Sequence, residues 1–333
     1  MKIIIPGGSG HVGTFLAKAF HAEGHEVVVL ARKSFAAPSR VVAWDGRTLG
    51  PWQEELDRAD VVINLAGRSV NCRYGTKNRE EIMRSRVDST HAIGQAILRA
   101  RRPPPVWLQA STATIYEHRF DAANDEFTGI LGGAEPNAPD TWRFSIDVAT
   151  AWEKAAREEA AVNGSRLVLL GSAIVMSPDH GGAFDMLLRL VRFGLGGAHG
   201  SGRQFVSWIH EADFLRAIRW LIANESIRER VNIAAPNPLP NAEFMRELRR
   251  AWGTRIGLPS TEWMLEIGAL FLRTETELIL KSRRVVPGRL LEHGFTFNFP
   301  HWPESARDLC ARWKENYAQH PARKPRPAIH PVA

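Results

Sequence analysis

The fold is constrained most by the N-terminal stretch, which runs Ile3-Ile4-Ile5-Pro6-Gly7-Gly8-Ser9-Gly10-His11-Val12-Gly13. An apolar run stops at the glycines and restarts after Gly13, which is the pattern of a strand, a tight turn and a helix. Gly7 permits a sharp turn, Gly10 leaves no Cβ to block a pyrophosphate, and Gly13 lets the helix pack closely. The helix N-terminus offers free N–H groups to phosphates. The stretch therefore predicts a dinucleotide-binding turn.

The surroundings of this turn strengthen the prediction. Three glycines at this spacing are a weak signal alone, and a purely structural glycine turn is the alternative. Here the turn follows an apolar strand and precedes a second one, Glu26-Val27-Val28-Val29-Leu30, at the spacing of a βαβ unit. We therefore favour a dinucleotide site.

The first half of the chain continues to alternate strands and helices, which predicts an α/β fold with a doubly wound parallel Rossmann sheet. Beyond Val175 the alternation loosens into a smaller, mostly helical C-terminal substrate lobe, and the run 231–235 returns to the sheet. We expect a Rossmann domain over 1–176, a lobe over 177–230 and 236–312, and a tail over 313–333 that is disordered toward its end. Further strands are expected at 41–45, 61–67, 106–110, 166–170 and 205–209, helices at 77–100, 141–162, 181–193 and from His210, and a surface loop or lid at 117–140.

Basic residues at the end of the second strand indicate which cofactor binds. Arg32 and Lys33 stand where a dinucleotide fold reads the adenosine ribose, and a cation there suits the 2′-phosphate of NADP(H). The alternative is a solvated pair of charges at a strand end. Asp45, at the end of the third strand, either approaches the adenine or caps a turn. Gly67 is one of the small residues at the end of the expected strand 61–67, where they let the backbone pass close to the cofactor.

Composition limits the other classes of function. Two cysteines, Cys72 and Cys310, exclude a disulfide framework, and the N-terminus has no apolar segment of a signal peptide. The formal net charge of +7 fits an anionic cofactor and a basic tail better than nucleic acid, because no basic run with interleaved aromatics is present. We expect a cytoplasmic protein with an unidentified small-molecule substrate, no metal site and no nucleic-acid or membrane partner, existing as a monomer or homodimer.

Four stretches together resemble a known family, the extended and atypical short-chain dehydrogenases/reductases known as epimerase-family proteins. The resemblance runs from residue 1 to about 310 and includes the small C-terminal module of that family. The four stretches are the glycine turn; Asn64-Leu65-Ala66-Gly67 with Ser85-Arg86-Val87; Gly194 to Gly197 with Gly200-Ser201-Gly202-Arg203-Gln204 and Ser207-Trp208-Ile209-His210; and Val285-Val286-Pro287 with Gly294-Phe295-Thr296-Phe297.

The resemblance implies a set of cofactor contacts. Relatives bind NADP(H) through the glycine turn, which includes Ser9, His11 and Val12 here, and through an arginine that matches Arg32. The remaining contacts match Leu65, Ala66, Glu81 and Arg86. For Arg86 there is also a physical reason, since a cation beside the cofactor cleft pairs with phosphate. A salt bridge to Glu81 or Asp88 is the alternative.

The catalytic residues do not follow the pattern of the wider superfamily. Its Tyr-x-x-x-Lys pair is absent, because Ser145 and Ala149 stand at the two positions and neither can do that chemistry. Serine is too weak an acid without an adjacent base, and alanine has no charge. Strand 106–110 delivers hydroxyls to the carboxyl edge of the sheet, where open α/β folds bind ligands. We expect Tyr116 to donate the proton and Ser111 or Thr112 to orient a carbonyl, although such hydroxyls also satisfy backbone groups.

Two functions remain open from the sequence. One is an NADP(H)-dependent oxidoreductase or epimerase acting on a small carbonyl or sugar-like substrate. The other is an NADP(H)-binding sensor or interaction protein without turnover. His210 stands at the start of a helix, where a capping role is the simpler expectation.

Overall fold

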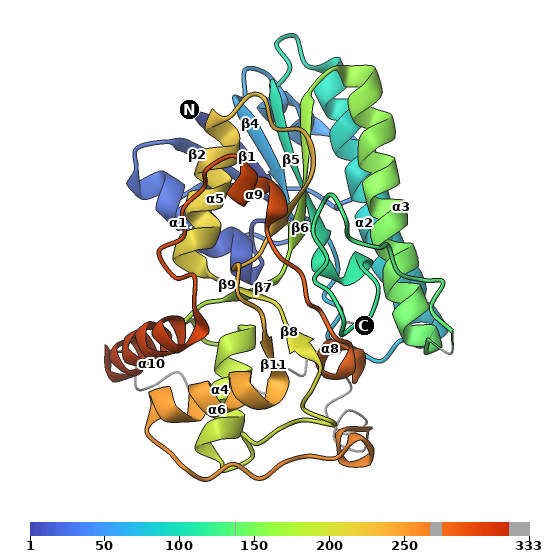
Figure 1. The fold of residues 1–333 in the computed structure, drawn as a ribbon. Coiled ribbons are helices and arrows are strands. Elements are labelled where there is room, and N and C mark those ends of the chain that lie inside the picture. Colours follow the sequence, from blue (N-terminus) through green and yellow to red (C-terminus); the bar gives the residue numbers. More distant parts are fainter. Residues whose placement is uncertain (137, 267–274, 320–333) are drawn as a thin grey trace.

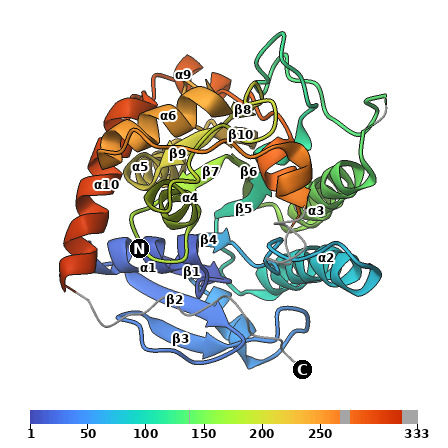
Figure 2. The same ribbon diagram turned by 90° about the horizontal axis from the view of Figure 1, so that it is seen from below.

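The computed structural model describes residues 1–136, 138–266 and 275–319. Its centre is a seven-stranded parallel sheet with the strand order β10-β6-β5-β4-β1-β2-β3, which Figure 2 shows edge-on from below. This doubly wound Rossmann arrangement confirms the predicted fold class. The strands are β1 (Lys2–Pro6), β2 (Glu26–Ala31), β3 (Arg40–Ala43), β4 (Val61–Asn64), β5 (Val106–Thr112), β6 (Arg166–Ser172) and β10 (Glu229–Ile233).

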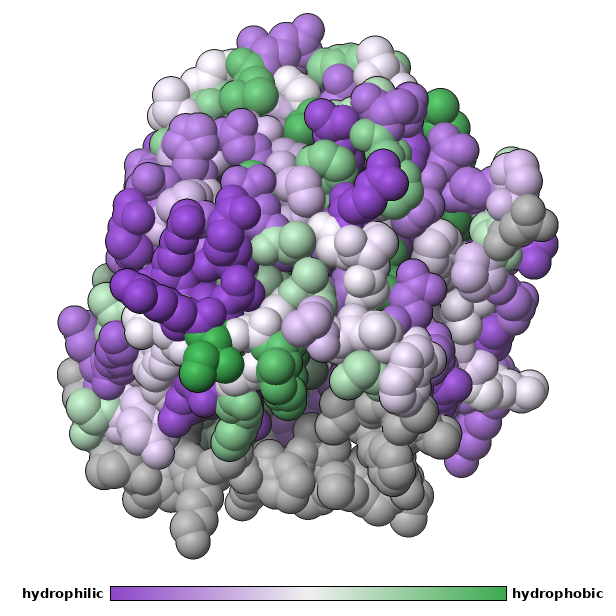
Figure 3. Space-filling model, turned by 60° about the horizontal axis from the view of Figure 1, so that its bottom comes forward, coloured by the Kyte–Doolittle hydropathy of each residue, from purple (hydrophilic) through white to green (hydrophobic). Residues whose placement is uncertain are grey.

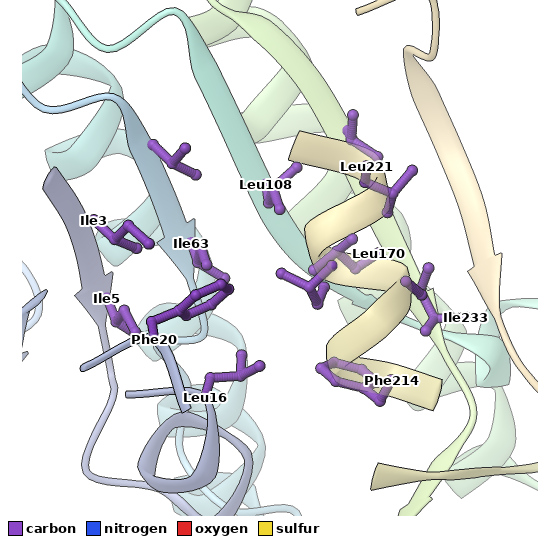
Figure 4. Close-up of a cluster of buried hydrophobic side chains, with 14 of the residues drawn as sticks. Ile3, Ile5, Leu16, Phe20, Ile63, Leu108, Leu170, Phe214, Leu221 and Ile233 are labelled. Carbon is purple, nitrogen blue, oxygen red and sulfur yellow. The ribbon is translucent and has the colours of Figure 1, made fainter. Parts of the chain in front are cut away.

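The sheet is buried on both faces because alternate side chains of its strands meet different layers of helix. Ile3 and Ile5 of β1 pack toward one face and Ile4 toward the other. Helices α1 (His11–Ala22) and α5 (Glu211–Ala223) cover the first face, and α2 (Thr76–Arg99) and α3 (Asp140–Asn163) the second (Figure 1). Figure 4 shows Leu16 and Phe20 of α1 and Phe214 and Leu221 of α5 over the strands.

Helix α5 falls within the stretch expected to belong to the substrate lobe, and it packs on the sheet instead. Phe214, Ala217, Ile218 and Leu221 are fully or almost fully buried in the same cluster as β6 and β10. The helix thus leads into β10 as the crossover of a further parallel strand. The Rossmann domain is therefore larger than the predicted range 1–176 with 231–235.

The second lobe has its own core, built around tryptophans. Trp208 and Trp302 lie edge to face at 5.0 Å, and Phe244 stacks on Trp302 at 3.9 Å. The predicted strand 205–209 is split here between two small sheets, since β8 pairs with β11 and β9 with β7. The elements of the lobe are β7 (Ile174–Met176), α4 (Ala183–Arg192), β8 (Phe205–Val206), β9 (Trp208–His210), β11 (Leu239–Pro240), α6 (Asn241–Trp252) and α10 (Trp302–Gln319).

Helix α10 extends past the predicted boundary at 312. Trp313 is 3% exposed in the lobe core, so the chain remains folded to Gln319. The predicted disordered end, from His320, lies outside the described residues. Short helices complete the fold: η1 (Pro51–Leu56), η2 (Ala113–Ile115), α8 (Glu277–Leu280) and α9 (Gly288–Glu292).

The lower face of the molecule is mostly hydrophilic and carries a small group of hydrophobic side chains (Figure 3). Among the exposed apolar residues of the lobe and its loops, Phe193 is 80% and Ile256 68% accessible. Within the described part of the chain, none of the helices has the length and apolar character needed to cross a membrane.

Candidate functional site

The glycine turn joins β1, β2 and α1 through backbone contacts. Gly7 has φ +76° and donates its N–H to the carbonyl of Leu30 at 2.9 Å. Gly13 packs on the turn itself, because a Cβ there would lie 2.4 Å from the Cα of Gly8. At Gly10 a Cβ would meet only the carbonyl oxygen of Gly7, at 3.5 Å. The side of Gly10 is thus open, as a turn that receives a ligand requires.

A pocket of about 550 Å³ opens beside this turn, at the carboxyl ends of β1, β2, β3 and β4. Seven of the predicted cofactor residues line it: Gly7, Ser9, Gly10, Arg32, Leu65, Ala66 and Gly67. His11, Val12, Gly13 and Lys33 do not line it. Residues that the sequence interpretation did not assign to the cofactor also contribute, namely Leu30, Ala31, Trp44, Gly46, Arg47, Arg68, Ser69 and Ser85.

Three arginines give this pocket its charge. Arg32 lies exposed at the end of β2, and Lys33 is exposed next to it. Arg47 lies 3.9 Å from Asp88, and Arg68 forms an ion pair with Glu81. Glu81 therefore holds Arg68 and does not itself line the pocket.

Asp45 also lines the pocket, and its carboxylate caps a turn. Oδ1 accepts the N–H groups of Arg47 and Thr48, both at 2.9 Å, and Oδ2 accepts the Thr48 hydroxyl at 2.6 Å. These bonds lower the pKa of Asp45 even though its partial burial acts to raise it. Of the two roles predicted for Asp45, turn capping is the one with contacts in the structure.

A second cavity, of about 250 Å³, lies directly beside the first pocket. The chain passes from one to the other at Ser69–Val70 and again at Ser85–Arg86, where each first residue lines the pocket and each second the cavity. The cavity is lined by Val70, Tyr74, Ile82, Arg86, Ser111, Thr112, Thr114, Phe144, Ser145, Val148, Ala149, Trp152, Glu277 and Arg283.

Arg86 stands at the boundary of the two spaces. A Cβ on Gly67 would touch its side chain at 3.3 Å, and its guanidinium lies 5.0 Å from the Trp152 ring. Nη1 donates to the backbone carbonyls of Arg68 and Ile82, both at 3.1 Å. Among the residues that the structure describes, no carboxylate pairs with Arg86. Burial lowers its pKa to about 10.

The predicted hydroxyls of β5 reach the cavity. Ser111 donates to Oε1 of the buried Glu153 at 2.5 Å, and Arg230 forms an ion pair with the same carboxylate. Thr112 accepts the N–H of Thr114 at 3.1 Å. Both hydroxyls line the cavity and both have a protein partner.

Tyr116, the expected proton donor, is not brought to the cavity. It is 2% exposed, and its hydroxyl donates to Oδ1 of Asn232 on β10 at 3.1 Å. Tyr116 does not line the cavity, whereas Ser111 and Thr112 do. Burial raises the pKa of the Tyr116 phenol. Its position gives no support to a role as proton donor.

A different group occupies the position of the superfamily tyrosine. Ser145 of α3 donates to Oε2 of Glu277 of α8 at 2.5 Å, and Arg283 lies 3.6 Å from the other carboxylate oxygen. Burial raises the pKa of Glu277. Tyr74 faces the same group, and burial together with Glu277 raises its pKa to about 12. The sequence interpretation missed Glu277 because 132 residues separate it from Ser145.

His210 has a structural role in the lobe. It is the N-cap of α5 and accepts the N–H of Ala212 at 3.1 Å, while its Nε2 lies 2.9 Å from Asp308. Its ring stacks on Phe299 at 3.9 Å. It lines neither space. Among the described residues, no group of three or more His, Cys, Asp or Glu side chains is arranged to hold a metal ion.

The chain is similar to known proteins over most of its length. The chain is 31% identical to the Bos taurus epimerase family protein SDR39U1 over 93% of this chain and all of the relative. It is 30% identical to the Bacillus subtilis epimerase family protein YfhF over 90% of this chain and 94% of the relative. The crystal structure of human SDR39U1 with NADPH superposes with a TM-score of 0.79 at 28% identity, over 93% of this chain and 99% of that one.

Two family models divide the chain. Residues 261–309 match a domain of unknown function (DUF1731), which contains Glu277 and Arg283. Residues 3–234 match the model of the NAD dependent epimerase/dehydratase family, and the chain belongs to that family.

Proposed function

We propose that this chain binds NADP(H) in the pocket beside the glycine turn and transfers a hydride between it and a small carbonyl or alcohol in the adjoining cavity. The turn fits the pyrophosphate of a dinucleotide. Gly7 holds a backbone conformation that favours glycine, and the space beside Gly10 is open where a side chain would intrude. The N-terminus of α1 starts at this point and favours negative charge.

The preference for the phosphorylated cofactor rests on Arg32. It lines the pocket from the end of β2, the position that reads the adenosine ribose in this fold. Arg47, from the turn after β3, lines the same pocket and adds a second cation. The solved structure of human SDR39U1 contains NADPH, which supports the same cofactor here.

One observation carries the proposal of turnover: the dinucleotide pocket adjoins a cavity that is lined by both hydroxyl groups and apolar side chains. The two spaces meet where Ser69 is followed by Val70 and Ser85 by Arg86. A volume of about 250 Å³ is suited to a small substrate. Ser111 and Thr112 lie at the carboxyl edge of the sheet, where ligands of open α/β folds bind.

In this mechanism the cofactor supplies or accepts the hydride. The chain holds the substrate between α2 and α3, where Phe144, Val148 and Trp152 exclude water. The Thr112 hydroxyl donates to the substrate oxygen and orients it. Arg86 places a positive charge at the boundary of the two spaces, toward the cofactor side at Gly67. An oxidoreductase releases the substrate after one hydride transfer, whereas an epimerase returns the hydride to the substrate before release.

Turnover is tested by following the loss of NADPH fluorescence with a panel of small aldehydes, ketones and sugar-like carbonyls. We expect at least one substrate to accelerate NADPH oxidation in the wild-type protein and none to do so in Gly10→Val, which lacks the cofactor space. If the wild type binds NADPH and oxidises it with no member of the panel, the sensor function replaces this proposal.

A further inference from the structure

The hydrogen bond between Ser145 and Glu277 has no role in the sequence-based account, yet it lies in the wall of the substrate cavity. Ser145 faces the cavity from α3 and is partly accessible there, whereas Glu277 is 2% exposed behind it. Ser145 Oγ and Glu277 Oε2 lie 2.5 Å apart, at the short end of the range of O–H···O hydrogen bonds. A serine, too weak an acid alone, thus has the adjacent acid–base group that it needs.

The second oxygen of Glu277 is unusual for a buried polar atom. Oε1 is shielded from solvent and has no hydrogen-bond partner among the described residues, and the nearest cation is Arg283 at 3.6 Å. Buried polar atoms nearly always have a hydrogen-bond partner, so an oxygen in a cavity wall that has only an ion pair at 3.6 Å among the described residues calls for an explanation. A carboxyl group that holds a proton in the resting state has a smaller desolvation cost than a carboxylate.

The segment that carries Glu277 is fixed to the end of β5. Lys281 donates to the carbonyl of Thr114 at 2.9 Å, and Arg283 donates to the Thr114 hydroxyl at 3.1 Å. Arg283 also donates to the backbone carbonyl of Glu277 at 3.2 Å. This bonding holds the carboxyl group against Ser145 rather than leaving it on a free loop.

We propose that the C-terminal domain of unknown function completes the reaction site: Ser145 exchanges a proton with the substrate oxygen, and Glu277 replenishes Ser145 from behind. The inference rests on the proposed hydride transfer. In the direction of reduction, NADPH gives a hydride to the carbonyl carbon and the C=O π electrons become a lone pair on oxygen. When substrate binds, the Ser145 hydroxyl turns from Glu277 to the substrate oxygen, and protonated Oε2 of Glu277 then donates to Ser145 Oγ. The substrate oxygen takes the Ser145 proton as Ser145 takes the Glu277 proton. Glu277 is left as a carboxylate and regains a proton from solvent.

Neighbouring charges suit this cycle. Burial and, to a smaller extent, Glu275 oppose the carboxylate that forms, while the positive Arg283 and Lys281 stabilise it. Burial and Glu277 raise the pKa of Tyr74 to about 12, so Tyr74 keeps its proton at neutral pH. The titratable and charged groups that face Glu277 or line the same cavity are Tyr74, Arg86, Glu275, Lys281 and Arg283.

The test compares Glu277→Gln, Ser145→Ala and Ser145→Thr with Glu126→Gln. Glu126 is a matched control, because burial also raises the pKa of its carboxyl but it contacts Asn232 and Arg289 outside the cavity. We expect the single-turnover rate of reduction to fall roughly a hundredfold or more in Glu277→Gln and Ser145→Ala. Ser145→Thr restores the hydroxyl and most of the rate, and Glu126→Gln keeps it. NADPH affinity is unchanged in all four.

Two further readouts separate a proton relay from a purely structural bond. The wild-type rate of reduction falls as the pH rises through the pKa of Glu277, and Glu277→Gln loses this dependence. Infrared spectra across a pH titration show a protonated carboxyl band in the wild type that is missing in Glu277→Gln. Wild-type rates and an unchanged pH profile in Glu277→Gln overturn the relay alone. Absence of turnover in a wild type that binds NADPH overturns the proposed function and the relay with it.

Discussion

Gly7 at the end of β1 lies against the backbone of Ala66 after β4, so closely that a Cβ on Gly7 would be 2.7 Å from both the N and the Cα of Ala66. The two loops that line the dinucleotide pocket are thus in direct contact. Gly7 also has φ +76°, which favours glycine. These features show why Gly7 is required by the fold, whereas Gly10, which has open space beside it, is free to serve the ligand.

Gly10→Val is expected to keep the fold and lose NADPH binding, because the added side chain fills the space for the pyrophosphate while its Cβ makes only an ordinary contact of 3.5 Å with the Gly7 carbonyl. Thermal melting and a fluorescence titration with NADPH measure the two effects. Gly50→Val is a suitable control, since Gly50 has extended backbone and a Cβ there would meet only Trp52 at 3.5 Å. Native melting together with wild-type affinity in Gly10→Val would show that the turn is only structural.

Arg32→Ala is expected to remove the preference for NADPH over NADH. A charge-assisted hydrogen bond contributes about 1.5–3 kcal/mol, which corresponds to roughly a tenfold to hundredfold change in the affinity ratio. Lys33→Ala should change the ratio much less, because Lys33 does not line the pocket. Calorimetric titrations of both cofactors into the three proteins provide the ratios. An unchanged ratio in Arg32→Ala would exclude Arg32 as the 2′-phosphate ligand.

Glu277→Gln is expected to gain thermal stability over the wild type as the pH rises. Burial raises the pKa of Glu277 above its ordinary value of 4.5, so the folded state favours the protonated form. The contribution of this group to stability is fully present below 4.5 and is lost as the pH rises through the folded-state pKa. Glutamine has no such proton to lose. If the melting-temperature difference between Glu277→Gln and the wild type stays constant from acidic to alkaline pH, the pKa of Glu277 is not raised in the folded protein.

Asp125→Asn is expected to change thermal stability with pH in the opposite direction to Glu277→Gln, because the folded protein lowers the pKa of Asp125 and raises that of Glu277. Backbone N–H groups of Phe127 and Thr128 donate to the Asp125 carboxylate and lower its pKa, against the effect of its partial burial. Its contribution is present above 3.8 and is lost as the pH falls through the lower folded-state pKa. The variant should therefore be less stable than the wild type at neutral pH, with a difference that shrinks in acid.

Tyr116→Phe is expected to leave the rate of hydride transfer unchanged. The tyrosine hydroxyl contacts Asn232 on the far strand β10 and lies outside the cavity. Loss of this buried hydrogen bond should lower the free energy of unfolding by about 1 kcal/mol, measured by urea denaturation. A hundredfold slower hydride transfer with intact NADPH affinity would restore Tyr116 as the proton donor.

The sheet could be predicted because each of its strands is a short apolar run rich in valine, isoleucine and leucine between turn residues. The glycine turn and Arg32 could also be predicted, because each lies next to one of these strands in the sequence. The lobe was harder to predict. Helix α6 carries many charges, and its Phe244, Met245 and Leu248 are buried at helical spacing, a periodicity that would have identified it.

The candidate catalytic group could not be predicted from local sequence. Ser145 was identified as the residue at the tyrosine position, but its partner Glu277 comes 132 residues later on a four-residue helix. No spacing rule connects two side chains that meet only through the tertiary fold. Tyr116 shows the opposite error: it follows the correct strand in the sequence, yet its hydroxyl bonds to Asn232 of β10 and does not line the cavity.

Transfer of deuteride from NADPH labelled at the nicotinamide C4 tests the central claim most directly. The wild-type protein is incubated with each C4 stereoisomer and the panel of small carbonyls, and the products are examined by mass spectrometry. We predict that one stereoisomer delivers deuterium to the carbonyl carbon of at least one substrate, and that Gly10→Val gives no labelled product. A wild-type protein that binds NADPH and yields no deuterated product from either stereoisomer would contradict hydride transfer in this site.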